Sequence, residues 1–183
     1  MSEPLCEGSD VWCVIHKSKQ PSEIRLGKLL CKVNHPAAAH EYYVGVKGKV
    51  ERFTADRLFA DITGIRKYVD EHKGWKSEPT VYSVDFDGTL VTDRFPDIGE
   101  INMRGVQFLM NVIFRGDKWI LNTMREGKLL DEAVEFLKRQ GFTPDAVNDN
   151  IDFMKATYKN NPRKIYADVY IDDHNAGGLQ WPK

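Results

Sequence analysis

The alternation of short apolar runs with amphipathic stretches in the second half of the chain constrains its fold more than any other feature. Runs typical of buried strands occur at Thr80–Phe86, Trp119–Leu121, Ala146–Val147 and Ile165–Ile171. Between them, apolar residues at helical spacing predict helices over Ile101–Arg115, Lys128–Gln140 and Ile151–Tyr158. Strands that alternate with helices in this way form parallel sheets through right-handed crossovers. The pattern predicts an α/β fold, a Rossmann-like parallel sheet with helices on both faces.

The first part of the chain has a different pattern, rich in Val, Ile, Tyr and Phe. It predicts strands at Val11–His16, Ile24–Val33, His40–Val46 and Val50–Phe53. One short helix is expected at Ile62–His72, and a segment with Gly, Ser and Pro, KGWKSEP at 73–79, separates the two patterns. We expect a small β-rich domain with one helix over 1–76, for which an SH3-like barrel would fit, and an α/β domain over 77–183.

The charge balance excludes a protein that acts mainly by binding nucleic acid or anionic membrane through a basic surface. Lys and Arg number 26 against 27 Asp and Glu, for a formal charge of −1. No apolar run approaches the roughly 18 residues that a membrane span needs. The acidic start, MSEPLCEGSD, does not resemble a secretory signal, and three cysteines argue against a closed disulfide framework. These features predict a cytoplasmic protein.

Acidic residues follow the first and the last strand of the α/β half directly. The strand predicted at Thr80–Phe86 runs straight into Asp85 and Asp87, and Asp172 and Asp173 come directly after the final strand. Ligands of open α/β sheets bind outside the carboxyl ends of the strands, so these carboxylates are expected to meet there. Either pair alone could be a solvated turn, but their joint placement favours a functional site.

Carboxylates brought this close repel each other, and a bound cation is the usual remedy. Hard oxygen ligands select Mg²⁺, which often binds through one or two carboxylates together with phosphate oxygens of a substrate. Gly88 allows a sharp turn directly after Asp87. Thr89 and, after the second strand, Thr123 supply hydroxyl groups. The sequence therefore indicates a Mg²⁺ and phosphate site.

These motifs resemble the haloacid dehalogenase superfamily of phosphohydrolases. VYSVDFDGTL is similar to its first motif, WILNT to its second, Lys164 in PRKIYAD to its third and VYIDD to its fourth. The four elements occur in family order over roughly residues 80–178, while the first 75 residues show no usable similarity. The segments TMREG and IDDHNAGGLQW are similar to small members described as nucleotidase-like.

The resemblance implies a covalent mechanism. Asp85 would attack phosphorus to form an aspartyl-phosphate, and Asp87 would act as general acid and base. Mg²⁺ would be held by the Asp85 carboxylate, the Asp87 backbone carbonyl and Asp172, with Asp173 nearby. Members that act on carbon–halogen bonds lack the second acid, so the presence of Asp87 indicates phosphoryl chemistry.

The resemblance also implies that Thr123, Met124 and Lys164 bind the phosphoryl group. Lys164 would open the final strand, although it could also be an ordinary surface lysine. Arg125 could reach the substrate or merely start the next helix, and Thr89 could support the site from behind. The gaps between motifs are used up by predicted helices and strands, so the domain would have no sizeable cap and an open site.

The interpretation is therefore a phosphatase acting on a small phosphorylated substrate, which could be a nucleotide. The alternatives are a non-catalytic phosphate- or metal-binding module, a phosphotransferase and a phosphatase of nucleic-acid ends. Aromatic and basic residues between Tyr42 and Phe59 could bind nucleic acid, but an aromatic core with solvated charges is the favoured explanation. The N-terminal domain either influences substrate choice or is an independent binding module.

Overall fold

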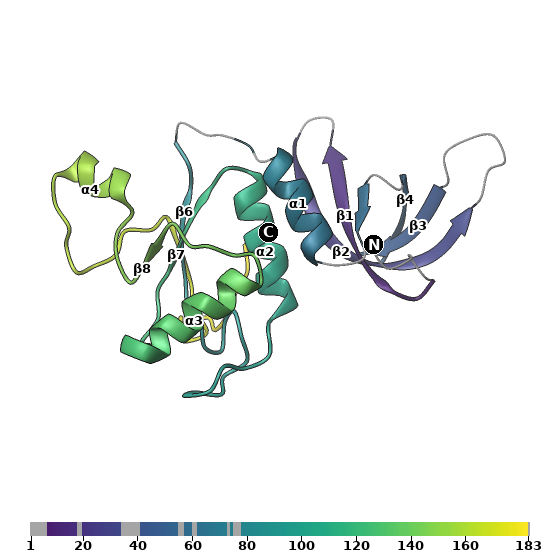
Figure 1. Cartoon of the computed structure of the whole chain (residues 1–183). Helices are drawn as coiled ribbons and strands as arrows, with labels where there is room; N and C mark the ends of the chain where they lie inside the picture. The colour runs from purple at the N-terminus through teal and green to yellow at the C-terminus, as the bar shows by residue number, and fades with distance from the viewer. Residues whose placement is uncertain are drawn as a thin grey trace. The chain divides into compact units, whose positions relative to one another are not determined.

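The computed structural model divides the chain into two compact units, Met1–Lys73 and Gly74–Lys183 (Figure 1). It describes residues 7–17, 20–33, 41–54, 57–59, 62–72, 74 and 78–182. The division lies beside the predicted boundary at 76/77. Within the described residues, every helix is too short or too polar to cross a membrane.

The N-terminal unit is an antiparallel sheet followed by one helix. Its described strands are β1 Asp10–Lys17, β2 Gln20–Val33, β3 Glu41–Val46, β4 Lys49–Thr54 and β5 Leu58–Phe59, in the order β4-β3-β2-β1-β5. The helix α1 spans Ile62–His72, as predicted. Lys47 and Gly48, which join β3 to β4, both have positive φ, the geometry that lets a two-residue turn follow the twist of a hairpin.

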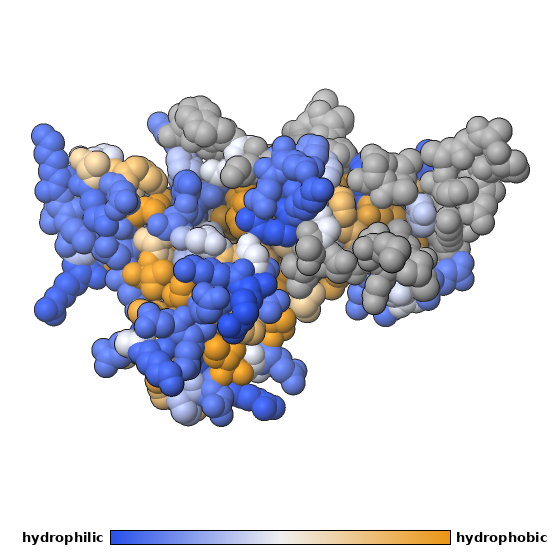
Figure 2. Space-filling model, viewed as in Figure 1, coloured by the Kyte–Doolittle hydropathy of each residue, from blue (hydrophilic) through white to orange (hydrophobic). Residues whose placement is uncertain are grey.

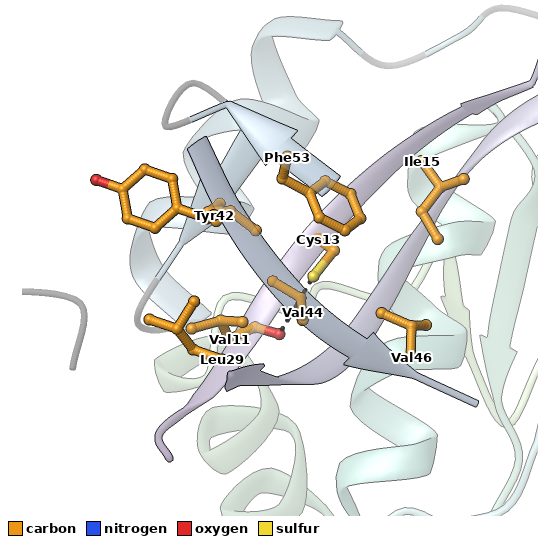
Figure 3. Close-up of a cluster of buried hydrophobic side chains, with 9 residues drawn as sticks. Val11, Cys13, Ile15, Leu29, Tyr42, Val44, Val46 and Phe53 are labelled. Carbon is orange, nitrogen blue, oxygen red and sulfur yellow. Dashed lines mark hydrogen bonds between the residues drawn. The ribbon is translucent and has the colours of Figure 1, made fainter. Parts of the chain in front are cut away.

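A cluster of apolar side chains forms a core of this unit. Its members come from all five strands and are Val11, Cys13, Ile15, Leu29, Tyr42, Val44, Val46, Phe53 and Leu58 (Figure 3). The thiol of Cys13 donates a weak hydrogen bond to the Val11 carbonyl, and burial raises its pKa to about 12. Tyr42 and Phe53 pair across β3 and β4 and belong to this core. The aromatic rings of Tyr42 and Phe53 therefore pack in the core of this unit.

The C-terminal unit is a parallel α/β sheet, as the alternating pattern predicts. Its elements are β6 Val81–Val84, α2 Met103–Phe114, β7 Lys118–Leu121, α3 Gly127–Arg139, β8 Ala146–Val147, α4 Asp152–Tyr158 and β9 Val169–Ile171. The strand order is β8-β7-β6-β9, with every pair parallel. Apolar strands and amphipathic helices thus formed the predicted layers, with most boundaries moved by one or two residues.

The helices lie on both faces of the sheet. The chain steps in one direction from β6 to β7 to β8, so right-handed crossovers place α2 and α3 on the same face. Phe108 of α2 makes an edge-on ring contact with Tyr82 there. The return from β8 to β9 carries α4 across the other face (Figure 1). On that face, Met154 packs with Val81, Ile120 and Ile151.

The final strand is shorter than predicted, because the residues expected to begin it pair with side chains instead. The N–H of Tyr166 donates to the side chain of Asn150, and the N–H of Val81 donates to the carboxylate of Asp168. Ile165 and Ala167 pack against the apolar cluster under α4. The prediction that Lys164 opens the final strand is therefore wrong.

The outer surface carries most of the charged residues. In the view of Figure 2, most of the described surface is hydrophilic and hydrophobic residues appear in separate patches. Large apolar side chains that remain exposed include Phe95 and Met124 in loops of the C-terminal unit. Both flank the strand ends where the acidic motifs lie, so these two exposed residues belong to the neighbourhood of the candidate site.

Candidate active site

Asp85 and Asp172 are neighbours because their strands pair in register. Val84 lies opposite Ile171 in the parallel β6–β9 ladder, and the N–H of Asp85 continues the ladder to the Ile171 carbonyl at 3.0 Å. Carboxylate oxygens of Asp85, Asp172 and Asp173 all lie within 4.8 Å of one another. The structure thus brings together three of the four predicted acids, in an arrangement that can hold a metal ion.

The environment of Asp85 disfavours its charged form. Burial raises the pKa of Asp85 from 3.8 to about 6, and the negative charges of Asp172 and Asp173 add to this increase. A backbone hydrogen bond from Phe86 and a side-chain hydrogen bond from Thr89 oppose it. A cation among these carboxylates would favour the ionised form that a nucleophile requires.

The turn after β6 is shaped by the acids it faces. Gly88 has φ +72°, and a Cβ at this position would collide with the carboxylate of Asp173. Thr89 is fully buried, and its Oγ1 accepts a hydrogen bond from the N–H of Asp173 at 3.2 Å. Gly88 therefore permits the close approach of the two loops, and Thr89 orients Asp173 from behind.

Asp173 carries an unpartnered atom. Its Oδ1 is buried and has no hydrogen-bond partner among the residues described. A buried carboxylate oxygen without a donor is costly, and a bound cation would remove that cost. This atom therefore fits a metal ligand better than it fits a structural carboxylate.

Asp87 lies in a different environment, paired with Arg125. The guanidinium donates to both carboxylate oxygens at 2.7 Å, from Nε to Oδ2 and from Nη2 to Oδ1. The Arg125 side chain is 1% exposed, and its hydrogen bonds to Asp87 raise its pKa further. The sequence left two roles open for Arg125, and the structure places it against the second aspartate of the first motif.

The loop after β7 is held to the loop after β8. Thr123 donates its N–H to Oδ1 of Asn148 at 2.8 Å, and its Oγ1 accepts the N–H of Arg125 at 3.2 Å. The Met124 side chain is almost fully exposed. Asn148 was not predicted as a site residue, although it directly follows the predicted strand Ala146–Val147. It has φ +47°, a conformation that asparagine tolerates better than most residues.

Lys164 lines a cavity whose lining residues do not include Asp85, Asp172 or Asp173. Lys164 is exposed, and the cavity, of about 690 Å³ on the α4 side of the sheet, is also lined by Tyr158, Tyr166 and Tyr170. No hydrogen bond or ion pair described for residues 78–182 joins Lys164 to Asp85, Asp172 or Asp173. The contact between Lys164 and a phosphoryl group therefore stays a prediction.

One solved structure is similar to this chain. It is that of a conserved protein from Bacteroides thetaiotaomicron, with a TM-score of 0.51 and 37% sequence identity over 56% of this chain and 83% of that one. No family model matches the sequence, and no curated protein matches it. The sequence identity indicates that the two chains share a common ancestor. It gives no activity for either chain.

Proposed function

We propose that this chain, which belongs to the same family as that conserved protein, is a phosphatase, and the acid cluster supports this proposal. The proposed reaction is Mg²⁺-dependent hydrolysis of a phosphate monoester through an aspartyl-phosphate on Asp85, the chemistry of the haloacid dehalogenase superfamily that its motifs resemble. The observation that carries the proposal is the meeting of Asp85 with Asp172 and Asp173 at the carboxyl end of two paired strands.

The acid cluster fits a hard divalent cation. Its donors are carboxylate oxygens, and Oδ1 of Asp173 is buried without a hydrogen-bond partner in the described structure. Asp85, Asp172 and the backbone carbonyl of Asp87 would hold the ion, with Asp173 beside them. When bound, Mg²⁺ supplies positive charge against the phosphoryl oxygens.

The two aspartates of the first motif have different roles in the proposed reaction. The Asp85 carboxylate attacks phosphorus, and the bond to the leaving oxygen breaks as that oxygen takes a proton from Asp87. Water then attacks the phosphorus and gives a proton to Asp87, while the bond between phosphorus and Asp85 breaks to release phosphate. Both residues return to their starting states, so water is the only other reagent.

Three further residues are proposed to bind the phosphoryl oxygens. Thr123 would contribute its hydroxyl, because its backbone N–H is already given to Asn148. Met124 would contribute its backbone N–H, since its exposed thioether side chain has no donor. Lys164 would supply positive charge, as the family resemblance implies.

Hydrolysis of an aryl phosphate by the purified chain tests the proposal. We expect turnover with Mg²⁺, loss of turnover in EDTA and loss by more than 100-fold in Asp85→Asn and in Asp172→Asn. Asp131→Asn, a change of an exposed carboxylate on α3, is the matched control and should leave turnover unchanged. Wild-type turnover by Asp85→Asn would refute the mechanism.

The class of substrate needs a separate measurement. A panel of phosphorylated metabolites, nucleotides and oligonucleotides phosphorylated at the 5′ or 3′ end would identify it. Adding an alcohol as acceptor distinguishes a phosphatase from a phosphotransferase, because only the latter would yield a new phosphate ester in preference to free phosphate.

A further inference from the structure

The Arg125 guanidinium is the most completely enclosed charge in the described part of the C-terminal unit. Besides its two bonds to Asp87, it donates from Nη1 to the Pro96 carbonyl at 2.9 Å and from Nη2 to the Asp97 carbonyl at 2.8 Å. Four hydrogen bonds thus engage a group that has five N–H donors. Its carbon atom also lies 5.2 Å from the centre of the Phe86 ring and 5.3 Å from that of Phe95.

Pro96 and Asp97 belong to a loop that is closed at its base. The N–H of Thr92 donates to the Glu100 carbonyl at 2.8 Å, and the N–H of Glu100 returns to Oγ1 of Thr92 at 2.9 Å. Residues 92–97 are exposed to solvent. The base of the loop is therefore held by its own hydrogen bonds, while Arg125 holds its tip.

The chemistry of the side chain explains why arginine suits this position. A guanidinium is planar and can give two parallel bonds to a carboxylate while its remaining donors face other acceptors. A lysine ammonium has three donors on one atom and cannot span Asp87 and two carbonyl groups in the same way. The geometry thus links one carboxylate and one loop through a single rigid group.

We propose that Arg125 is a positioning residue that orients the carboxyl group of Asp87 and couples its orientation to the loop of residues 92–100. The inference rests on the proposed function, in which Asp87 protonates the leaving oxygen. Displacement of the loop would then shift Arg125 and, through it, the acid, so the loop regulates proton transfer without touching Asp85.

The proposed role has a specific chemical signature. The two bonds from Arg125 fix the orientation of the Asp87 carboxyl group, and with it the direction in which this group faces the leaving oxygen. Protonation matters most when the leaving group is a poor one, such as an alkoxide, and little when it is a stable anion. A misplaced acid therefore slows hydrolysis of alkyl phosphates much more than that of 2,4-dinitrophenyl phosphate.

The test compares Arg125→Lys with the wild-type chain on both kinds of substrate. We expect kcat on an alkyl phosphate to fall by about 100-fold, the scale of general acid catalysis, with little change on 2,4-dinitrophenyl phosphate. Asp87→Asn should show the same selective loss, and Arg139→Lys, on the exposed surface of α3, should show none. Equal losses on both substrates would overturn the positioning role.

The loop is tested independently of catalysis by hydrogen exchange. Arg125→Lys should speed amide exchange over residues 92–100, and Phe95→Ala, which removes an exposed ring beside the guanidinium, should do so more weakly while the fold is kept. Unchanged exchange in both variants would overturn the coupling. An inactive wild-type chain with faster loop exchange in Arg125→Lys would instead refute the phosphatase proposal and leave the coupling supported.

Discussion

The raised pKa of Asp85 predicts how the stability of the C-terminal unit depends on pH in the absence of divalent cations. Its pKa is 3.8 for an unperturbed carboxyl and about 6 in the fold, chiefly because of burial. Between these values the folded chain keeps a proton that the unfolded chain releases. The contribution of Asp85 to stability is thus fully present below pH 3.8 and is lost as the pH rises through about 6.

The size of the effect follows from this difference in proton affinity. A tenfold change in affinity corresponds to about 1.4 kcal/mol, so the full difference sets a limit of about 3 kcal/mol. Solvent screens a carboxylate that is only partly buried, so we expect roughly 1–2 kcal/mol. For a domain of about 100 residues, each ~1 kcal/mol changes Tm by roughly 4–8 °C.

Thermal unfolding in EDTA, followed by circular dichroism, measures this effect. Asp85→Asn has no carboxyl to ionise, so its Tm relative to wild type should be higher at pH 7.5 than at pH 4.5. The expected difference is roughly 3–10 °C, because about two-thirds of the effect falls between these two pH values. Added Mg²⁺ at pH 7.5 should stabilise wild type more than the variant. A Tm difference that is the same at both pH values would refute the reasoning.

Three other changes test the surroundings of the site. Gly88→Ala should lower Tm and weaken the stabilisation by Mg²⁺, because its Cβ would collide with the Asp173 carboxylate at positive φ; an unchanged Mg²⁺ titration would contradict this. Asp117→Ala should cost about 1–3 kcal/mol in urea unfolding, because it leaves the N–H of Thr80 without its carboxylate acceptor. A chain lacking residues 1–76 should still hydrolyse an aryl phosphate but show a flatter preference among natural substrates, and an identical substrate profile would exclude a role of the N-terminal unit in specificity.

Local patterns in the sequence were sufficient for the main elements and for part of the site. Helix α1 was predicted with the bounds that the structure has, Ile62–His72, because its apolar residues repeat at helical spacing. Asp85 and Asp172 were predicted to meet because each follows a buried strand, and parallel strands place their carboxyl ends at one edge. Both inferences need only the periodicity of nearby residues.

Elements that depend on distant partners were not predictable in this way. The strand β5, Leu58–Phe59, has two residues and exists because they pair with Trp12 and Cys13. The run Ile165–Ile171 is apolar except for Asp168, yet only Val169–Ile171 pairs as a strand. Apolar composition indicates burial, but it does not distinguish a residue that pairs in a sheet from one that packs beneath a helix.

The pairing of Asp87 with Arg125 was decided by the tertiary structure alone. The sequence placed an acid after β6 and an arginine after β7, and each had several possible partners. Their contact depends on the path of the loop that contains Pro96 and Asp97. The carbonyl groups of these two residues accept the remaining hydrogen bonds of the guanidinium. A sequence does not show which backbone carbonyls will accept hydrogen bonds from a side chain, because every residue has one. Only the folded chain determines which of them face a buried charge, and therefore which acid that charge holds.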